Sequence, residues 1–267
     1  NSMWQTVQTI LERRQLLLHG VCAFADVANA LLPCRAAARL PANAARVLVT
    51  LFPYRFTDSG ARNLSRYACV PDYHIAAGDW LRETAQELAA ALPDWHFEPF
   101  IDNSPIPEVK AAALAGLGCI GDNGLLLHPQ YGSWVFIGTI VTDAPLPCSS
   151  AALRYCPHCG RCAAACPGGC LPQGDRSTCL SAVSQRKGTL TPEEQARLRQ
   201  NGLAWGCDTC QEVCPLNADT LCAPHPCFSS YRPLLTKADT AELSGKAYGW
   251  RGAAVPLRNL QILDEDS

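Results

Sequence analysis

The sequence predicts an α/β fold in which helices cover a central sheet, followed by a cysteine-rich segment and a short tail. Two observations support this prediction. Helical and strand patterns alternate along residues 1–147, and twelve of the sixteen cysteines lie in residues 148–227. Residues 228–267 contain no cysteine and no periodic pattern. We therefore predict an α/β domain at 1–147, a cysteine-rich domain at 148–227 and a tail at 228–267 that packs on the body.

The first predicted elements follow from apolar spacing. A stripe from Trp4 to Leu18 predicts a helix that ends at Gly20. Residues 46–52 are apolar and rich in β-branched side chains, and Pro53 follows them directly. This run predicts a buried strand, since proline ends a ladder of backbone hydrogen bonds.

A second helix and strand follow. Apolar residues repeat at helical spacing from Leu81 to Leu92, just before Pro93. Residues 95–101 alternate as a short strand. These patterns predict a helix–strand pair.

The remaining elements of the first part are short. Pro107 opens an alanine-rich helix at 108–115 that stops at Gly116. Residues 122–124 form a turn, and residues 134–141 predict another strand.

One clear helix is expected in the cysteine-rich part. Thr191 and Glu194 form a capping box with Pro192 at the first helical position, and Gly202 ends the helix.

The composition excludes several classes of protein. Charged residues make up 17% and hydrophobic residues 48%, which excludes a disordered chain. The net charge is −2, so no overall positive charge attracts DNA. Charges at Glu12, Arg13 and Arg14 interrupt the first apolar pattern, and no run of 18 apolar residues exists. We therefore expect a protein of the reducing cytoplasm, without a membrane partner, whose cysteines are metal ligands.

The cysteine spacing predicts two iron–sulfur clusters. Residues 156–167 follow the pattern C-x2-C-x2-C-x3-C-P of bacterial ferredoxins. A second run at 207–215 lacks one cysteine, which Cys179 can supply. Eight thiolates then suffice for two 4Fe–4S clusters in a bacterial ferredoxin-like domain. By the ferredoxin rule that the fourth cysteine serves the other cluster, cluster one takes Cys156, Cys159, Cys162 and Cys214, and cluster two takes Cys166, Cys179, Cys207 and Cys210.

Alternatives remain at this stage. Paired C-x2-C motifs also bind zinc, but four ligands on one short loop poorly surround a single small ion. Cys170 or Cys222 could replace Cys179 in cluster two. The cysteines outside the clusters are expected to be buried apolar side chains or idle thiols; they are Cys22, Cys34, Cys69, Cys119, Cys148, Cys170, Cys222 and Cys227.

Several motifs together resemble the epoxyqueuosine reductase family. They span about residues 20–220 in the expected order. The resemblance is carried by Asp72-Tyr73-His74, by Asp102-Asn103-Ser104-Pro105-Ile106-Pro107-Glu108, by residues 115–121, by residues 132–138, and by the run from Gly206 to Pro215.

The resemblance implies a cobalamin-dependent reductase with two 4Fe–4S clusters, related in fold to reductive dehalogenases. It implies that residues 1–147 bind cobalamin, and that the enzyme reduces epoxyqueuosine to queuosine in tRNA. Asp102 would be the catalytic proton donor, although an aspartate before a helix could equally be a cap. The residues that the resemblance places at the cofactor are Tyr73, His74, Asp102, Asn123, Gly132 and Ser133.

Three positions depart from the family pattern, so the sequence alone does not identify the substrate. Val109 stands where the family has arginine, Asp122 where it often has lysine, and Val70 where basic residues are common. Phosphates supply most of the affinity for RNA, so this pattern argues against tight tRNA binding. The alternatives are a related corrinoid reductase acting on a small molecule or a protein-bound corrinoid, and a non-enzymatic two-cluster electron carrier. An electron donor of ferredoxin or flavodoxin type is expected for the enzyme.

Overall fold

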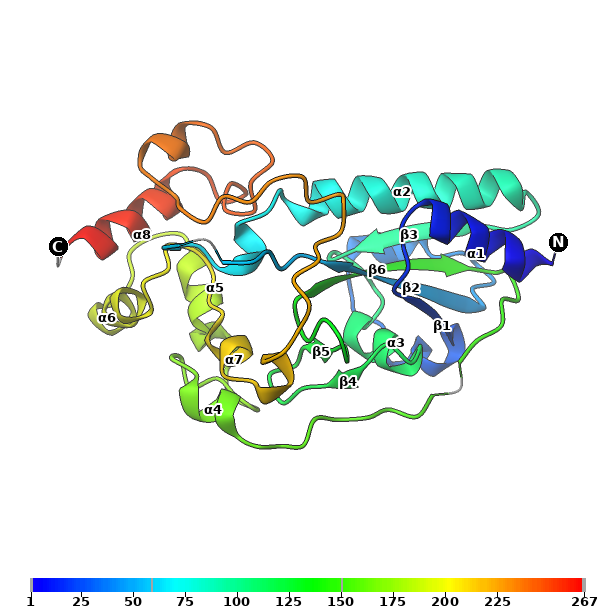
Figure 1. Cartoon of the computed structure of the whole chain (residues 1–267), viewed down its shortest axis with the longest axis horizontal. Helices are drawn as coiled ribbons and strands as arrows, with labels where there is room; N and C mark the ends of the chain where they lie inside the picture. The colour runs from blue at the N-terminus through cyan, green and yellow to red at the C-terminus, as the bar shows by residue number, and fades with distance from the viewer. Residues whose placement is uncertain (1, 59, 150, 266–267) are drawn as a thin grey trace.

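The computed structural model describes residues 2–58, 60–149 and 151–265. The chain forms two lobes along its long axis, with the termini at opposite ends (Figure 1). We call the part with the large sheet the sheet lobe, and the part with α4 to α8 the cysteine lobe. No helix among these described residues is long and apolar enough to cross a membrane.

The sheet lobe is built on four antiparallel strands in the order β1-β2-β6-β3. Their bounds are His19–Ala23, Arg46–Pro53, Val135–Thr142 and Phe97–Ile101. β2 and β6 pair along their whole length, from Arg46 opposite Thr142 to Pro53 opposite Val135. A small second sheet pairs β4 (Cys119–Ile120) with β5 (Leu126–Leu127). The prediction of a mixed α/β fold with a central sheet is confirmed.

Helices cover both faces of this sheet (Figure 1). α1 (Met3–Arg13) and α2 (Tyr73–Ala91) pack on one face, and α3 (Glu108–Leu114) packs on the other. Because side chains alternate along a strand, Leu48 packs toward α1 and α2, while Val47 and Val49 pack toward α3. This burial on both faces explains why β2 is a continuous apolar run in sequence.

The predicted elements of the sheet lobe are mostly confirmed. β2, β3, α3 and β6 lie where the sequence placed them, and α2 begins earlier than predicted, at Tyr73. The first helix was predicted wrongly to end at Gly20, because it ends at Arg13 and the chain then forms β1. Gly20 allows close packing at this point, because a Cβ on it would lie 2.4 Å from the carbonyl oxygen of Ala115. β1 therefore lies against the end of α3.

The cysteine lobe contains short helices and no strand among its described residues. They are α4 (Arg161–Ala165), α5 (Leu180–Gln185), α6 (Pro192–Asn201), α7 (Thr209–Glu212) and α8 (Ala254–Asp264). The capping box of α6 is confirmed, with Thr191 as N-cap and Gly202 as C-cap. The sequence missed α8, which lies in the predicted tail and contacts α5 and α6. Its apolar residues pack against neighbouring helices. Tertiary contacts therefore stabilise this helix, and its local sequence carries no strong helical pattern.

The segment from Tyr54 to Asp72 leaves the sheet lobe and runs to the cysteine lobe (Figure 1). Leu64 packs there with Trp205 and Tyr248. The buried carboxylate of Asp208 accepts hydrogen bonds from the Arg62 side chain and the Arg66 backbone of this segment. The three-part division of the chain stays a prediction, but this segment links the lobes and leads directly into α2.

Candidate functional site

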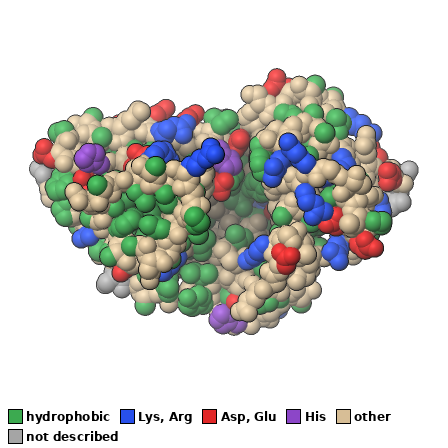
Figure 2. Space-filling view, turned by 180° about the vertical axis from the view of Figure 1, so that it is seen from behind, with side chains coloured by type: hydrophobic (Ala, Val, Ile, Leu, Met, Phe, Trp, Pro, Cys, Tyr) green, Lys and Arg blue, Asp and Glu red, His purple; other side chains and the backbone are tan. Residues whose placement is uncertain are grey.

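A cavity of about 690 Å³ lies between the two lobes. Figure 2 shows the molecule hollowed between them, with apolar and charged side chains on the walls. The sheet lobe and the linking segment contribute Tyr54, Tyr67, Asp72, Tyr73, His74, Asp102, Asn123, Leu125, Ser133, Val135 and Phe136. The cysteine lobe contributes Arg176, Cys179, Ser181, Gln185, Cys207, Cys210, Gln211, Ala247 and Trp250.

His74 joins two carboxylates in this cavity. Asp72 caps α2, and its Oδ1 lies 2.8 Å from Nδ1 of His74. Asp102 directly follows β3, and its Oδ2 lies 2.7 Å from Nε2 of His74. Asp102 has a φ of 55°, in the left-handed region that non-glycine residues seldom adopt. The turn after β3 thus holds Asp102 in strained backbone and places its side chain against α2.

The positive charge of His74 and the negative charges of the two carboxylates stabilise one another. The hydrogen bonds that His74 donates to Asp102 and Asp72 raise its pKa to about 9, although burial opposes them. The hydrogen bond from His74 holds the pKa of Asp102 below its ordinary value. His74 is therefore protonated and Asp102 ionised at neutral pH. The pair can store one proton and transfer it across a single hydrogen bond.

The buried carboxyl group of Glu108 lies near this triad. Burial, together with the charge of Asp102, raises the pKa of Glu108 well above its ordinary value. Its Oε1 is buried and has no hydrogen-bond partner among the described residues. The neutral, protonated form of Glu108 is thus favoured near Asp102. The sequence placed Glu108 in the motif but gave it no role.

Aromatic rings form one wall of the cavity. Tyr73 stacks on Phe136 with ring centroids 4.1 Å apart and planes 10° apart, and the ring of Tyr54 also packs on Phe136, with centroids 4.5 Å apart. Burial, and secondarily the charge of Asp102, raises the pKa of Tyr73. The wall is therefore apolar and uncharged beside an ionic triad.

Of the three further residues predicted to contact a cofactor, two line the cavity and one does not. Asn123 and Ser133 line the cavity, and Ser133 donates a hydrogen bond to Oε1 of Gln211 at 2.8 Å. Gly132 does not belong to the lining. A Cβ on Gly132 would lie 1.9 Å from Oδ1 of Asn217, which accepts a hydrogen bond from the backbone of Ser133. The structure thus gives Gly132 a packing reason, with a φ of 59°, and its approach to a cofactor stays a prediction.

Four cysteines surround a second, smaller cavity of about 180 Å³. It adjoins Asn123, which lines the large cavity as well. These are the four that the sequence assigned to cluster one: Cys156, Cys159, Cys162 and Cys214. All sixteen cysteines of the chain are free thiols.

The cysteines assigned to cluster two also lie together. Burial and the neighbouring Cys207, Cys179 and Cys166 raise the pKa of Cys210 to about 12. Cys170 is buried, and its Sγ lies 3.6 Å from that of Cys166. The structure thus places a fifth thiol beside this set.

Cys222 behaves differently from Cys170. It is exposed and lines neither the large nor the small cavity. Of the two alternatives to Cys179, the geometry therefore favours only Cys170.

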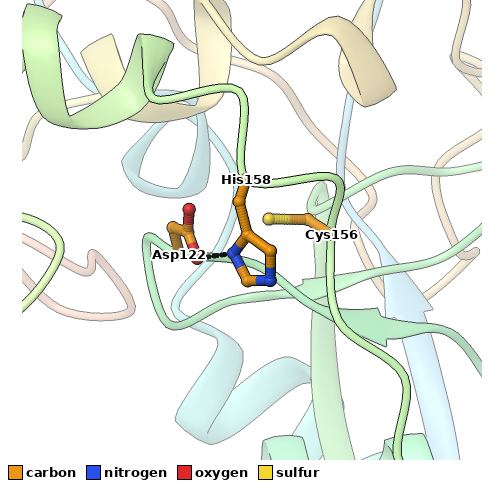
Figure 3. A group of neighbouring side chains, drawn as sticks. All are labelled: Asp122, Cys156 and His158. Carbon is orange, nitrogen blue, oxygen red and sulfur yellow. Dashed lines mark hydrogen bonds and ion pairs between the residues drawn. The ribbon is translucent and has the colours of Figure 1, made fainter.

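His158 lies between Asp122 and Cys156 (Figure 3). Their potential ligand atoms lie within 4.8 Å of one another, and Nδ1 of His158 is 2.7 Å from Oδ1 of Asp122. Cys156 and Asp122 also line the small cavity. We therefore regard this trio as part of the edge of that cavity.

Sequence comparisons agree with the proposed cysteine site. Residues 155–217 match the family model of the 4Fe-4S double cluster binding domain. An epoxyqueuosine reductase of Gloeobacter violaceus is 39% identical over 163 residues, covering 59% of this chain and 50% of that protein. One from Bacillus anthracis is 34% identical over 206 residues, covering 72% and 53%. The chain spans about half the length of these curated relatives.

Solved structures share the fold over nearly the whole chain. An epoxyqueuosine reductase from Streptococcus thermophilus superposes with a TM-score of 0.79 at 21% identity, covering 96% of this chain and 79% of that one. An epoxyqueuosine reductase with an epoxyqueuosine-modified tRNA-Tyr stem loop gives 0.79 at 23%, covering 98% and 81%. A catabolic reductive dehalogenase gives 0.50 at 16% identity, covering 96% of this chain and 36% of that one. The resemblance predicted from the sequence motifs is confirmed.

Proposed function

We propose that this chain carries the activity of epoxyqueuosine reductases, the reduction of epoxyqueuosine to queuosine in tRNA with cobalamin and two 4Fe–4S clusters. One observation carries the proposal. The cavity between the lobes brings the His74–Asp102 pair together with Cys179, Cys207 and Cys210. A proton source and an electron source thus face the same space.

The cysteine geometry fits two clusters. Cluster one would occupy the small cavity ringed by Cys156, Cys159, Cys162 and Cys214. Cluster two would be held by Cys166, Cys179, Cys207 and Cys210, three of which line the large cavity. Cluster two would therefore pass electrons into that cavity, and cluster one would receive them near the surface, where Cys159 is exposed. A donor of ferredoxin or flavodoxin type in the reducing cytoplasm belongs to the same proposal.

The large cavity fits a flat, bulky cofactor. Tyr73 and Phe136 offer a stacked apolar wall, and Asn123 and Ser133 offer polar contacts. His74 is the one histidine in this lining, and both its nitrogens are held by carboxylates, so it would not coordinate a metal. Bound cobalamin would supply the electron pair that opens the epoxide. Residues 1–147 with the cysteine lobe would hold it.

The chain's own residues would supply protons. Reducing an epoxide to an alkene takes up two electrons and two protons and releases water. His74 holds one proton at Nε2 and passes it to Oδ2 of Asp102, which donates it to the departing oxygen. Burial and the charge of Asp102 raise the pKa of Glu108, which would provide the second proton. Tyr73 contacts the His74 ring, with centroids 4.1 Å apart, and, with Phe136, would limit access of water to the proton-transferring pair.

The proposal is tested on anaerobically reconstituted protein. We expect about eight iron atoms per chain, a changed cob(II)alamin spectrum on binding, and queuosine in a treated stem loop that carried epoxyqueuosine. A changed spectrum without turnover of the RNA would indicate a corrinoid reductase with another substrate. An unchanged spectrum at saturating protein would indicate an electron carrier and refute the proposed enzyme.

A further inference from the structure

Four residues of the cysteine lobe form a surface at the edge of the central cavity. Trp250 lines that cavity, and its neighbour Arg251 lines an adjoining pocket of about 580 Å³ together with Lys187 and Arg258. The two hollows therefore meet at the Trp250–Arg251 pair. We call these four residues the basic aromatic surface.

Trp250 is exposed but held in place. Its side chain has a relative exposure of 59%, high for a large aromatic residue. The guanidinium of Arg251 lies over the indole, 3.7 Å from the ring centroid. The indole N–H donates a hydrogen bond to Oε1 of Gln185 at 3.2 Å. The ring is thus fixed before any partner binds, which lowers the entropic cost of stacking on it.

The positive charges beside Trp250 have no acidic partner among the described residues. Arg258 forms no ion pair within the described part of the chain, but its guanidinium donates to the carbonyl oxygens of Ser184, Arg186 and Gly188 and to Oδ1 of Asn259, so its N–H groups are used within the fold. Nε of Arg251 is buried without a hydrogen-bond partner. Lys187 is exposed.

The nearby acids are paired elsewhere. Glu265 lines the pocket but lies 3.6 Å from Arg199, and Glu194 pairs with Arg186 at 2.5 Å. The basic aromatic surface therefore attracts anions.

We propose that the basic aromatic surface binds the RNA strand next to the nucleotide that enters the cavity. Trp250 stacks on a neighbouring base, and Lys187 and Arg251 bind the phosphates that follow. The charge of Arg258 adds to the attraction without a direct hydrogen bond, since its N–H groups donate within the fold. Aromatic stacking combined with cationic side chains is the common mode of binding single-stranded nucleic acid. The inference rests on the proposed function, since it needs RNA as the substrate. It also explains how a chain of net charge −2 could bind RNA.

RNA binding tests the inference without turnover. A fluorescein-labelled, unmodified anticodon stem loop of tRNA-Tyr is titrated with cluster-loaded protein at several salt concentrations. Trp250→Ala should weaken binding about tenfold at an unchanged salt slope, while Trp250→Phe should lose much less. Lys187→Ala should lower the slope of log K against log salt by about 0.7 to 0.9. Arg35→Ala, which removes an exposed charge from the sheet lobe, should leave the slope unchanged.

The outcomes separate this inference from the proposed function. Binding by the wild type that no variant alters would overturn the inference and leave the proposed function standing. A loss of cob(II)alamin affinity in Trp250→Ala, with RNA affinity unchanged, would place Trp250 in the cofactor wall and overturn it too. A wild type that does not bind the stem loop would overturn both the inference and the RNA substrate.

Discussion

Nε2 of His74 lies 2.7 Å from Oδ2 of Asp102, across 28 residues of sequence. The same ring reaches Asp72 through Nδ1. Both ring nitrogens can donate only when the imidazole is protonated, so the geometry itself favours a positive ring. The two carboxylates come from the start of α2 and the end of β3. The proton of this site therefore lies on His74, and Asp102 is ionised until that proton moves.

Asp102→Asn keeps the size of the side chain but removes the carboxyl group that would transfer the proton. We expect turnover to fall by about 10² or more, the usual scale of general acid catalysis. Cob(II)alamin binding should persist, because the aromatic wall is unchanged. The pKa of His74 should fall, since its largest stabilising contact is lost. Rate measurements and an NMR titration of His74 check both parts, and full activity in the variant would remove Asp102 from its role.

The stability contributed by His74 should depend on pH in a defined direction. Its pKa rises from 6.5 in the unfolded chain to about 9 in the folded one. The folded state therefore binds the proton more tightly, and this stabilisation is complete below about pH 6.5 and lost as the pH rises through 9. The free energies of unfolding of the wild type and His74→Gln should differ most below pH 6.5 and converge above pH 9. A difference that grows with pH would contradict the assigned charges.

Cysteine variants should identify the ligands of cluster two. Cys179→Ser should reduce the iron content from about eight to about four atoms per chain, because one cluster loses a ligand. Cys222→Ser, which changes an exposed thiol outside both cavities, is the matched control and should keep all the iron. If Cys179→Ser keeps both clusters and Cys170→Ser does not, the buried Cys170 is the ligand.

Gly132→Ala should destabilise the fold more than Gly202→Ala. Both glycines have positive φ, of 59° and 74°, so both variants carry a backbone cost of about 1 kcal/mol. Only at Gly132 would the new methyl group overlap other side chains, those of Asn217 and Thr220; nothing lies within 4 Å of a Cβ at Gly202. Denaturant unfolding followed by circular dichroism measures both. Equal losses would show that Asn217 moves aside easily.

The sequence by itself determined features that depend on near neighbours. The capping box at Thr191 and the strand at 46–53 each follow from contacts within one turn or one strand pairing. The cluster motif is equally local, since most ligands of each set come from one short loop. Such signals survive in sequence because the residues that make them lie only a few positions apart.

Only the tertiary structure decided what distant segments do together. It placed Asp72, His74 and Asp102 in one hydrogen-bonded triad and buried Glu108 beside it. It turned Gly132 toward Asn217, 85 positions along the chain. It also gathered Lys187 and Arg258 near Trp250, although the chain as a whole has a net charge of −2. Electrostatic energy and packing depend on distance in space, and a chain that folds into two facing lobes sets those distances through contacts that no local pattern contains.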